Sequence, residues 1–167
     1  MMKTTKVLAV ALVSTALVFG CGDKDSSSKG KTKDTTKSAA LKMVKTDLPG
    51  LKLTMQAPEG ATVTGKGMTF VRKGNGFSIQ LQKDVYGVTG DKLIIPFEKK
   101  LMIKKLVDEP NLQIWTKKMI DKPVVLFAMK VKVGETKYYV QSGGMGMFTR
   151  AQVDTMIKAA RTLAEKK

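Results

Sequence analysis

Alternating apolar and polar residues between glycine-rich turns dominate the sequence from residue 51 to residue 82. Such a period of two predicts β-strands that bury one face. Turns are expected at Pro58–Gly60, Gly65–Gly67 and Gly74–Gly76, because glycine tolerates the positive φ angles of tight hairpins. The segment therefore predicts a four-stranded antiparallel meander, with strands at Leu51–Met55, Ala61–Thr64, Met68–Val71 and Phe77–Gln82.

A helix is expected after the meander, at Pro96–Val107. Proline suits the first turn of a helix, and Pro110 marks its end. The apolar residues of this segment spread widely around the helical wheel, which indicates contacts on more than one side. Three more strands are expected beyond it, at Leu112–Thr116, Val124–Val133 and Lys137–Ser142.

The C-terminal helix is the element with the clearest local signals. Thr149 as N-cap and Gln152 three residues later have the pattern of a capping box. Val153, Met156 and Ile157 then begin an apolar face at helical spacing. The resulting order, ββββ-α-βββ-α, predicts an α+β domain in which helices pack on an antiparallel sheet of about seven strands.

Residue types that dominate enzyme active sites are scarce in this chain. Its 167 residues include no His and a single Cys, Cys21. This composition excludes a Ser-His-Asp triad, a Cys-His pair and a His-ligated zinc site. It also excludes an intrachain disulfide. We therefore expect a protein that is not an enzyme and holds neither a metal nor a cofactor.

The first 20 residues have the organisation of a secretion signal. Lys3 and Lys6 precede an apolar run, Val7–Phe19, which is shorter than the roughly 20 residues of a membrane-spanning helix. The run ends in Leu17-Val18-Phe19-Gly20-Cys21. This ending resembles the lipobox of bacterial lipoproteins, in which an aliphatic residue at −3 and a small residue at −1 precede the Cys. The alternative is an ordinary secretion signal with a free Cys.

The lipobox resemblance implies a lipid anchor on the cell envelope. It implies diacylglycerol on the Cys21 thiol, cleavage before Cys21, and acylation of the new amino group, for example with palmitate. Several acyl chains together anchor a protein stably. Gly22 stands where an Asp would retain a Gram-negative lipoprotein in the inner membrane. The resemblance therefore favours the outer membrane, facing the periplasm, in a Gram-negative host.

Residues 21–40 are expected to be a flexible tether that follows the signal peptide, residues 1–20. From Gly22 to Ala40 the chain has no aromatic and no large aliphatic residue, so it cannot bury enough apolar surface to offset the entropy of ordering. Residues 41–167 remain as a single domain. This domain carries 23 Lys and Arg against 11 Asp and Glu, a net charge of +12.

A ten-residue stretch of the domain resembles the PsbP-like group. The stretch is Leu51-Lys-Leu-Thr-Met-Gln-Ala-Pro-Glu-Gly60. The expected lipid anchor and order of elements fit the same group, which includes some bacterial lipoproteins. The resemblance implies an α+β fold and binding of partners rather than catalysis, and it assigns no functional residue.

A glycine-rich loop between the last strand and the C-terminal helix is the first candidate site. Backbone N–H groups at a helix N-terminus can hold a phosphate or carboxylate, and an arginine there adds charge. The alternative is a loop that simply needs positive φ angles to turn. The candidate anion or ligand loop consists of Gly143, Gly144, Gly146, Thr149 and Arg150.

A set of lysines forms the second candidate site, if the fold places them on one face. Such a patch would attract anionic lipid headgroups or an acidic envelope protein. Nucleic acid is not an expected partner, because the compartment is wrong and aromatic residues are few. The alternative is a set of separate solvated side chains. The candidate basic patch consists of Lys99, Lys100, Lys104, Lys105, Lys130 and Lys132.

Two functions remain open. The first is an envelope-anchored lipoprotein whose non-catalytic domain binds a partner protein or an anionic envelope surface. The alternative is a small-ligand-binding lipoprotein that uses the glycine-rich loop and a cleft lined by Trp115, Tyr138 and Tyr139. Core packing of these aromatic residues is the competing explanation for them.

Overall fold

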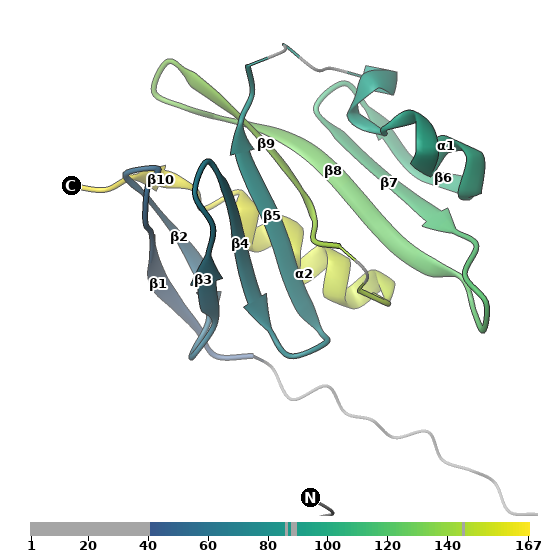
Figure 1. Ribbon diagram of the computed structural model, residues 1–167, viewed down its shortest axis with the longest axis horizontal. Coiled ribbons are helices and arrows are strands. Elements are labelled where there is room, and N and C mark those ends of the chain that lie inside the picture. Colours follow the sequence, from purple (N-terminus) through teal and green to yellow (C-terminus); the bar gives the residue numbers. More distant parts are fainter. Residues whose placement is uncertain (1–40, 86, 88–89, 145) are drawn as a thin grey trace, which may run out of the picture. The chain divides into compact units, whose positions relative to one another are not determined.

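A computed structural model of the protein describes residues 41–85, 87, 90–144 and 146–167 (Figure 1). These residues belong to one compact unit, which spans Ala39–Lys167. The buried apolar side chains run from Leu48 to Leu163, so the domain contains its own core. The expected signal peptide, Cys21 and the tether lie outside the described residues and stay predictions.

The described strands form two antiparallel sheets. In the larger sheet the strand order is β3-β4-β5-β9-β8-β7-β6, and in the smaller sheet it is β1-β2-β10. The larger sheet consists of β3 (Thr62–Thr64), β4 (Met68–Lys73), β5 (Phe77–Lys83), β9 (Thr136–Ser142), β8 (Val124–Val133), β7 (Leu112–Lys117) and β6 (Met102–Glu109). The smaller sheet consists of β1 (Met43–Leu48), β2 (Leu53–Pro58) and β10 (Ala164–Glu165).

Helical segments accompany the larger sheet. A 3-10 turn, η1 (Gly90–Leu93), and a short helix, α1 (Pro96–Leu101), precede β6, and α2 (Arg150–Ala160) follows β9. The α+β class with mainly antiparallel sheet is therefore confirmed. The predicted order of elements differs from the observed one, because β1 and β10 were not expected. In addition, β2 pairs within the smaller sheet instead of beginning the meander.

The helix predicted at Pro96–Val107 is wrong beyond Leu101. The chain continues from there as the edge strand β6, which pairs with β7. Its register with β7 shifts between Met102 and Lys104 and again between Lys105 and Val107. These irregularities leave the exposed residues Ile103 and Leu106 without partners in the ladder. Such bulges interrupt the period of two, which explains why the sequence resembles a helix.

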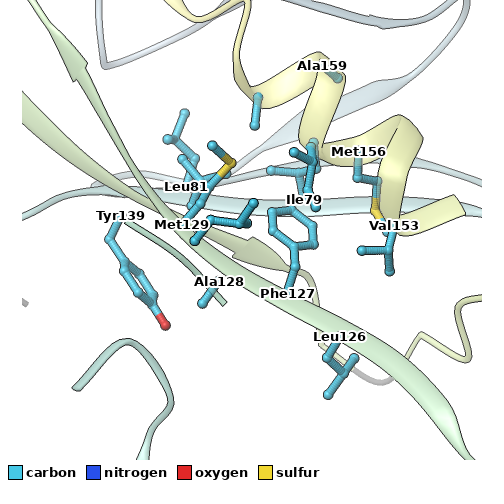
Figure 2. Close-up of a cluster of buried hydrophobic side chains, with 14 of the residues drawn as sticks. Ile79, Leu81, Leu126, Phe127, Ala128, Met129, Tyr139, Val153, Met156 and Ala159 are labelled. Atoms are coloured by element: carbon cyan, nitrogen blue, oxygen red, sulfur yellow. The ribbon is translucent and has the colours of Figure 1, made fainter. Parts of the chain in front are cut away.

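The main core lies between the larger sheet and α2. Ile79 of β5 and Phe127 of β8 point toward Val153 and Met156 of α2 (Figure 2). All four side chains are fully buried. Successive strand residues alternate between the two faces of the sheet, so Tyr139 points away from the helix. The face opposite α2 therefore carries a different set of side chains, many of them polar.

Candidate anion-binding site

A hollow of about 560 Å³ lies where the loop between β9 and α2 meets the turn between β4 and β5. Among the described residues that line it are two cations, Arg72 and Lys122, and no carboxylate. Such a lining favours an anionic group. The lining residues are Arg72, Gly74, Asn75, Ser78, Lys122, Gly143, Gly144, Gly146, Met147 and Phe148.

A different structural feature explains the glycine at each of the three loop positions, 143, 144 and 146. The Gly143 N–H donates to the Ser78 carbonyl over 2.7 Å, and a Cβ on Gly143 would lie 2.3 Å from the Ser78 Oγ. Gly144 has a φ of 55°, which favours glycine. A Cβ on Gly146 would lie 1.9 Å from the Phe148 ring. The close approach of the loop to β5 thus depends on Gly143, whereas Gly144 and Gly146 allow the course of the loop itself.

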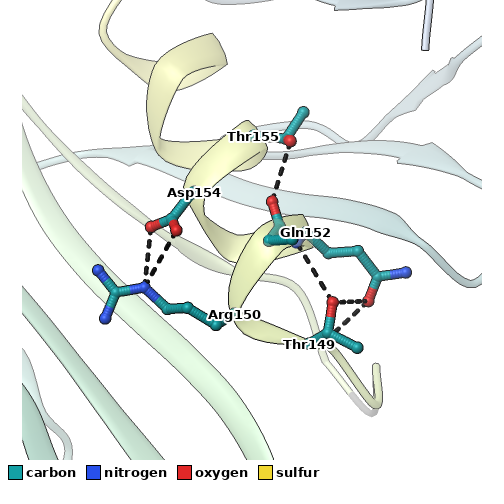
Figure 3. Close-up of polar contacts among 6 residues, drawn as sticks. Thr149, Arg150, Gln152, Asp154 and Thr155 are labelled. Atoms are coloured by element: carbon teal, nitrogen blue, oxygen red, sulfur yellow. Dashed lines mark hydrogen bonds and ion pairs between the residues drawn. The ribbon is translucent and has the colours of Figure 1, made fainter. Parts of the chain in front are cut away.

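Thr149 and Arg150 belong to the helix start and do not line the hollow (Figure 3). The Thr149 Oγ1 accepts from the Gln152 N–H, and the Gln152 Oε1 accepts from the Thr149 N–H, so the predicted capping box is confirmed. The Arg150 Nε donates to the Asp154 carboxylate at 2.9 Å. Since these groups already bond within α2, the site consists of the glycine positions with cations from elsewhere.

From the sequence alone, the two cations of the hollow were not associated with the glycine loop. Arg72 lies on β4, where its guanidinium sits 4.7 Å from the centre of the Phe70 ring. This cation–π contact holds the arginine over the sheet. Lys122 comes from the turn between β7 and β8. Neither residue is near the glycine loop in sequence, so no local pattern joins them to it.

The six lysines of the predicted basic patch lie on three elements, α1, β6 and β8. Lys99 and Lys100 lie on α1, whereas Lys104 and Lys105 follow each other on β6 and point to opposite faces. The Lys105 Nζ lies 2.8 Å from an Asp108 carboxylate oxygen.

The last two lysines of the predicted patch, both on β8, differ in burial. The Lys130 Nζ lies 2.8 Å from the Asp84 carboxylate, and both side chains are buried. Lys132 is exposed and lies 3.3 Å from Glu135. Lys130 is therefore a buried partner of Asp84 rather than a surface cation, which corrects its predicted role.

The three aromatic residues of the predicted cleft do not line one common cavity. Tyr138 and Tyr139 are adjacent on β9, so they point to opposite faces of the sheet. Trp115 lines a cavity of about 140 Å³ together with Glu98, Gln141 and Gly144. Tyr139 lines a separate hollow of about 210 Å³. The fold thus brings Trp115 to the glycine loop but does not gather the three aromatic residues.

Tyr139 is a buried residue of β9 that connects this strand to η1 by a hydrogen bond. Its hydroxyl donates to the Leu93 carbonyl over 2.6 Å. Burial, and then the nearby Glu98 carboxylate, raise the pKa of Tyr139 to about 12. Glu98 itself pairs with Lys117 at 2.8 Å. A tyrosine with this pKa keeps its proton near pH 7, so its hydroxyl remains a hydrogen-bond donor to the Leu93 carbonyl.

No group of three or more Asp, Glu, Cys or His side chains converges in the described part of the chain. None of the described helices is long and apolar enough to cross a membrane.

The fold and the hollow define an α+β domain of two antiparallel sheets with a cationic hollow at one end. Comparisons with protein-family models, curated proteins and solved structures gave no match to the chain. The resemblances to bacterial lipoproteins and to the PsbP-like group stay predictions.

Proposed function

We propose that this protein is a lipid-anchored protein of the cell envelope whose domain binds anionic groups without catalysing a reaction. The observation that supports the proposal is the hollow of about 560 Å³, in which Arg72 and Lys122 accompany the glycine loop. The net charge of +12 on residues 41–167 draws anions to the domain over longer distances.

The form of the hollow fits an anion attached to a larger body. Arg72, Lys122 and Gly144 are all exposed, so the hollow faces solvent. An arginine binds two oxygens of a phosphate or carboxylate at once, and a lysine adds a point charge. A phosphate or carboxylate on a partner protein or on an envelope surface can therefore enter without any rearrangement of the core.

A lipid on Cys21 would keep the domain close to such ligands. A flexible chain of 20 residues has a root-mean-square span of about 25 Å. The tether would therefore raise the effective concentration of envelope anions around the domain. Weak individual contacts would then suffice for binding.

Titration of a soluble anion tests this function. We expect glycerol phosphate to bind residues 22–167, with amide shifts at Gly143 and Gly144 in NMR spectra. The double variant Arg72→Gln/Lys122→Gln should lose most of this binding. Lys99→Gln/Lys132→Gln removes the same charge from exposed positions on α1 and β8 and is the matched control. Equal losses in the two variants would mean that net charge, and not the hollow, attracts the anion.

A second candidate function rests on the cavity beside Trp115. The Trp115 Nε1 and the Glu98 Oε2 are buried without a hydrogen-bond partner, and both residues line the cavity of about 140 Å³. Buried polar groups are normally satisfied, so a small molecule with one acceptor and one donor would complete them. Native mass spectrometry of the purified chain tests this alternative. A mass equal to that of the bare polypeptide would count against it.

A further inference from the structure

The turn between β4 and β5, which lines the hollow, and the start of β1 lie at the same end of the domain (lower edge of Figure 1). The Glu59 N–H donates to the Lys42 carbonyl over 2.8 Å, which places the beginning of the domain beside the turn between β2 and β3. The Lys73 Nζ lies 3.4 Å from the Gly60 carbonyl oxygen of that turn. Lys73 ends β4, next to the turn that lines the hollow.

The other side of the hollow presents exposed apolar side chains. Ile120, two residues before Lys122 in the turn between β7 and β8, is 100% exposed. Met147, which lines the hollow, is 53% exposed. A wholly exposed isoleucine in a turn adds nothing to the core, and it is free to contact another body.

The charges around these apolar residues are mostly positive. Arg72, Lys73, Lys118 and Lys122 are exposed at this end, and Lys42 is offset by its ion pair with Glu59 at 3.0 Å. Asp121 is an exposed carboxylate in the same turn as Ile120. Exposed aliphatic side chains among cations are the combination that binds the interface of an anionic membrane.

We propose that this end of the domain docks on an anionic phospholipid bilayer. Ile120 and Met147 enter the headgroup region, and the hollow between Arg72 and Lys122 receives a lipid phosphate. The assignment of the phosphate rests on the proposed function of the hollow. The described chain begins at this same end, with Lys42 beside the turn between β2 and β3, which is compatible with an anchor at Cys21 on the same membrane.

A fluorescent label at Ile120 tests the insertion. Residues 22–167 contain no Cys, because Cys21 is the single one, so Ile120→Cys accepts one environment-sensitive dye. Val85→Cys is the matched control, since Val85 is 69% exposed and follows β5 at the opposite end. With vesicles of phosphatidylglycerol and phosphatidylcholine, the dye at position 120 should shift to the blue and the dye at 85 should not. Vesicles of phosphatidylcholine alone should shift neither dye.

Affinity measurements separate this inference from the proposed function. Ile120→Ser should weaken binding to the anionic vesicles about five- to tenfold and leave glycerol phosphate binding unchanged. Val85→Ser should change neither. If Ile120→Ser binds vesicles like the unaltered chain while glycerol phosphate still binds, the docking surface is refuted and the anion site stands. If the unaltered chain binds vesicles but not glycerol phosphate, the anion site fails and only the apolar contact survives.

Discussion

The ammonium group of Lys130 lies 2.8 Å from the carboxylate of Asp84, and only 6% and 2% of these side chains are exposed. Lys130 lies on β8, and Asp84 directly follows β5. A buried charge is tolerated because a counter-ion lies beside it, and removal of one partner of a buried pair is strongly destabilising.

Lys130→Met should therefore destabilise the domain strongly. Methionine retains an unbranched side chain but removes the ammonium group beside the buried Asp84 carboxylate, so we expect the free energy of unfolding to fall by about 3–5 kcal/mol. Lys132→Met, at an exposed position on the same strand, should change it by less than about 0.5 kcal/mol. Urea unfolding of both variants measures the difference. Equal stabilities would show that the buried pair contributes nothing.

Tyr139 gives the domain a specific sensitivity to alkali. The raised pKa of about 12 means that the folded state keeps the phenol proton more tightly than the unfolded chain, whose tyrosine titrates near pH 10. The associated stability is complete below pH 10 and is lost as the pH rises toward 12, to the extent of about 2–3 kcal/mol. Tyr139→Phe should therefore be less stable than the unaltered chain at pH 8, with the gap narrowing by pH 11. A stability difference between Tyr139→Phe and the unaltered chain that does not change with pH would contradict the raised pKa of Tyr139.

Elements whose signals lie within a few residues could be predicted from the sequence. The capping box of α2 depends on Thr149 and Gln152 alone, and it was predicted correctly. The Met102–Glu109 segment could not be predicted, because its strand character depends on pairing with β7 and its bulges disrupt the alternation. The strand β1 was missed because it is an edge strand with few buried residues, so its sequence has no apolar face to detect.

The site could be predicted only in part, for a related reason. Three glycines in a short stretch predicted the loop. The cations that accompany it, however, come from β4 and from the turn between β7 and β8. Lys130 looked solvated, since lysines alternate with valines at the end of β8 as they do on a half-exposed strand. Its partner Asp84 is distant in sequence, and only the sheet brings the two residues together.

The cap of α2 supports a third prediction. Thr149→Ala removes the hydroxyl that accepts from the Gln152 N–H, and the free energy of unfolding should fall by about 1 kcal/mol. Arg150→Ala removes only an exposed pair with Asp154, so its effect should stay below about 0.5 kcal/mol. Thermal unfolding at neutral pH compares the two variants. A larger loss for Arg150→Ala would reverse the roles assigned to these neighbours.

The contact between Gly143 and Ser78 links the stability of the fold to the hollow. In Gly143→Ala the new Cβ would lie 2.3 Å from the Ser78 Oγ, so the loop must move away from β5. We expect a loss of about 1–3 kcal/mol in stability and weaker glycerol phosphate binding.

A double variant distinguishes this clash from a general effect of alanine in the loop. Ser78→Ala removes the Oγ, although the Ser78 Cβ would still lie 3.3 Å from the new methyl group. The double variant Gly143→Ala/Ser78→Ala should therefore lose at least about 0.5 kcal/mol less than the sum of the single losses, because the two residues share one contact. Urea unfolding of the unaltered chain, the two single variants and the double variant completes this double-mutant cycle. Strictly additive losses would show that the clash with the Ser78 Oγ does not account for the cost of alanine at position 143.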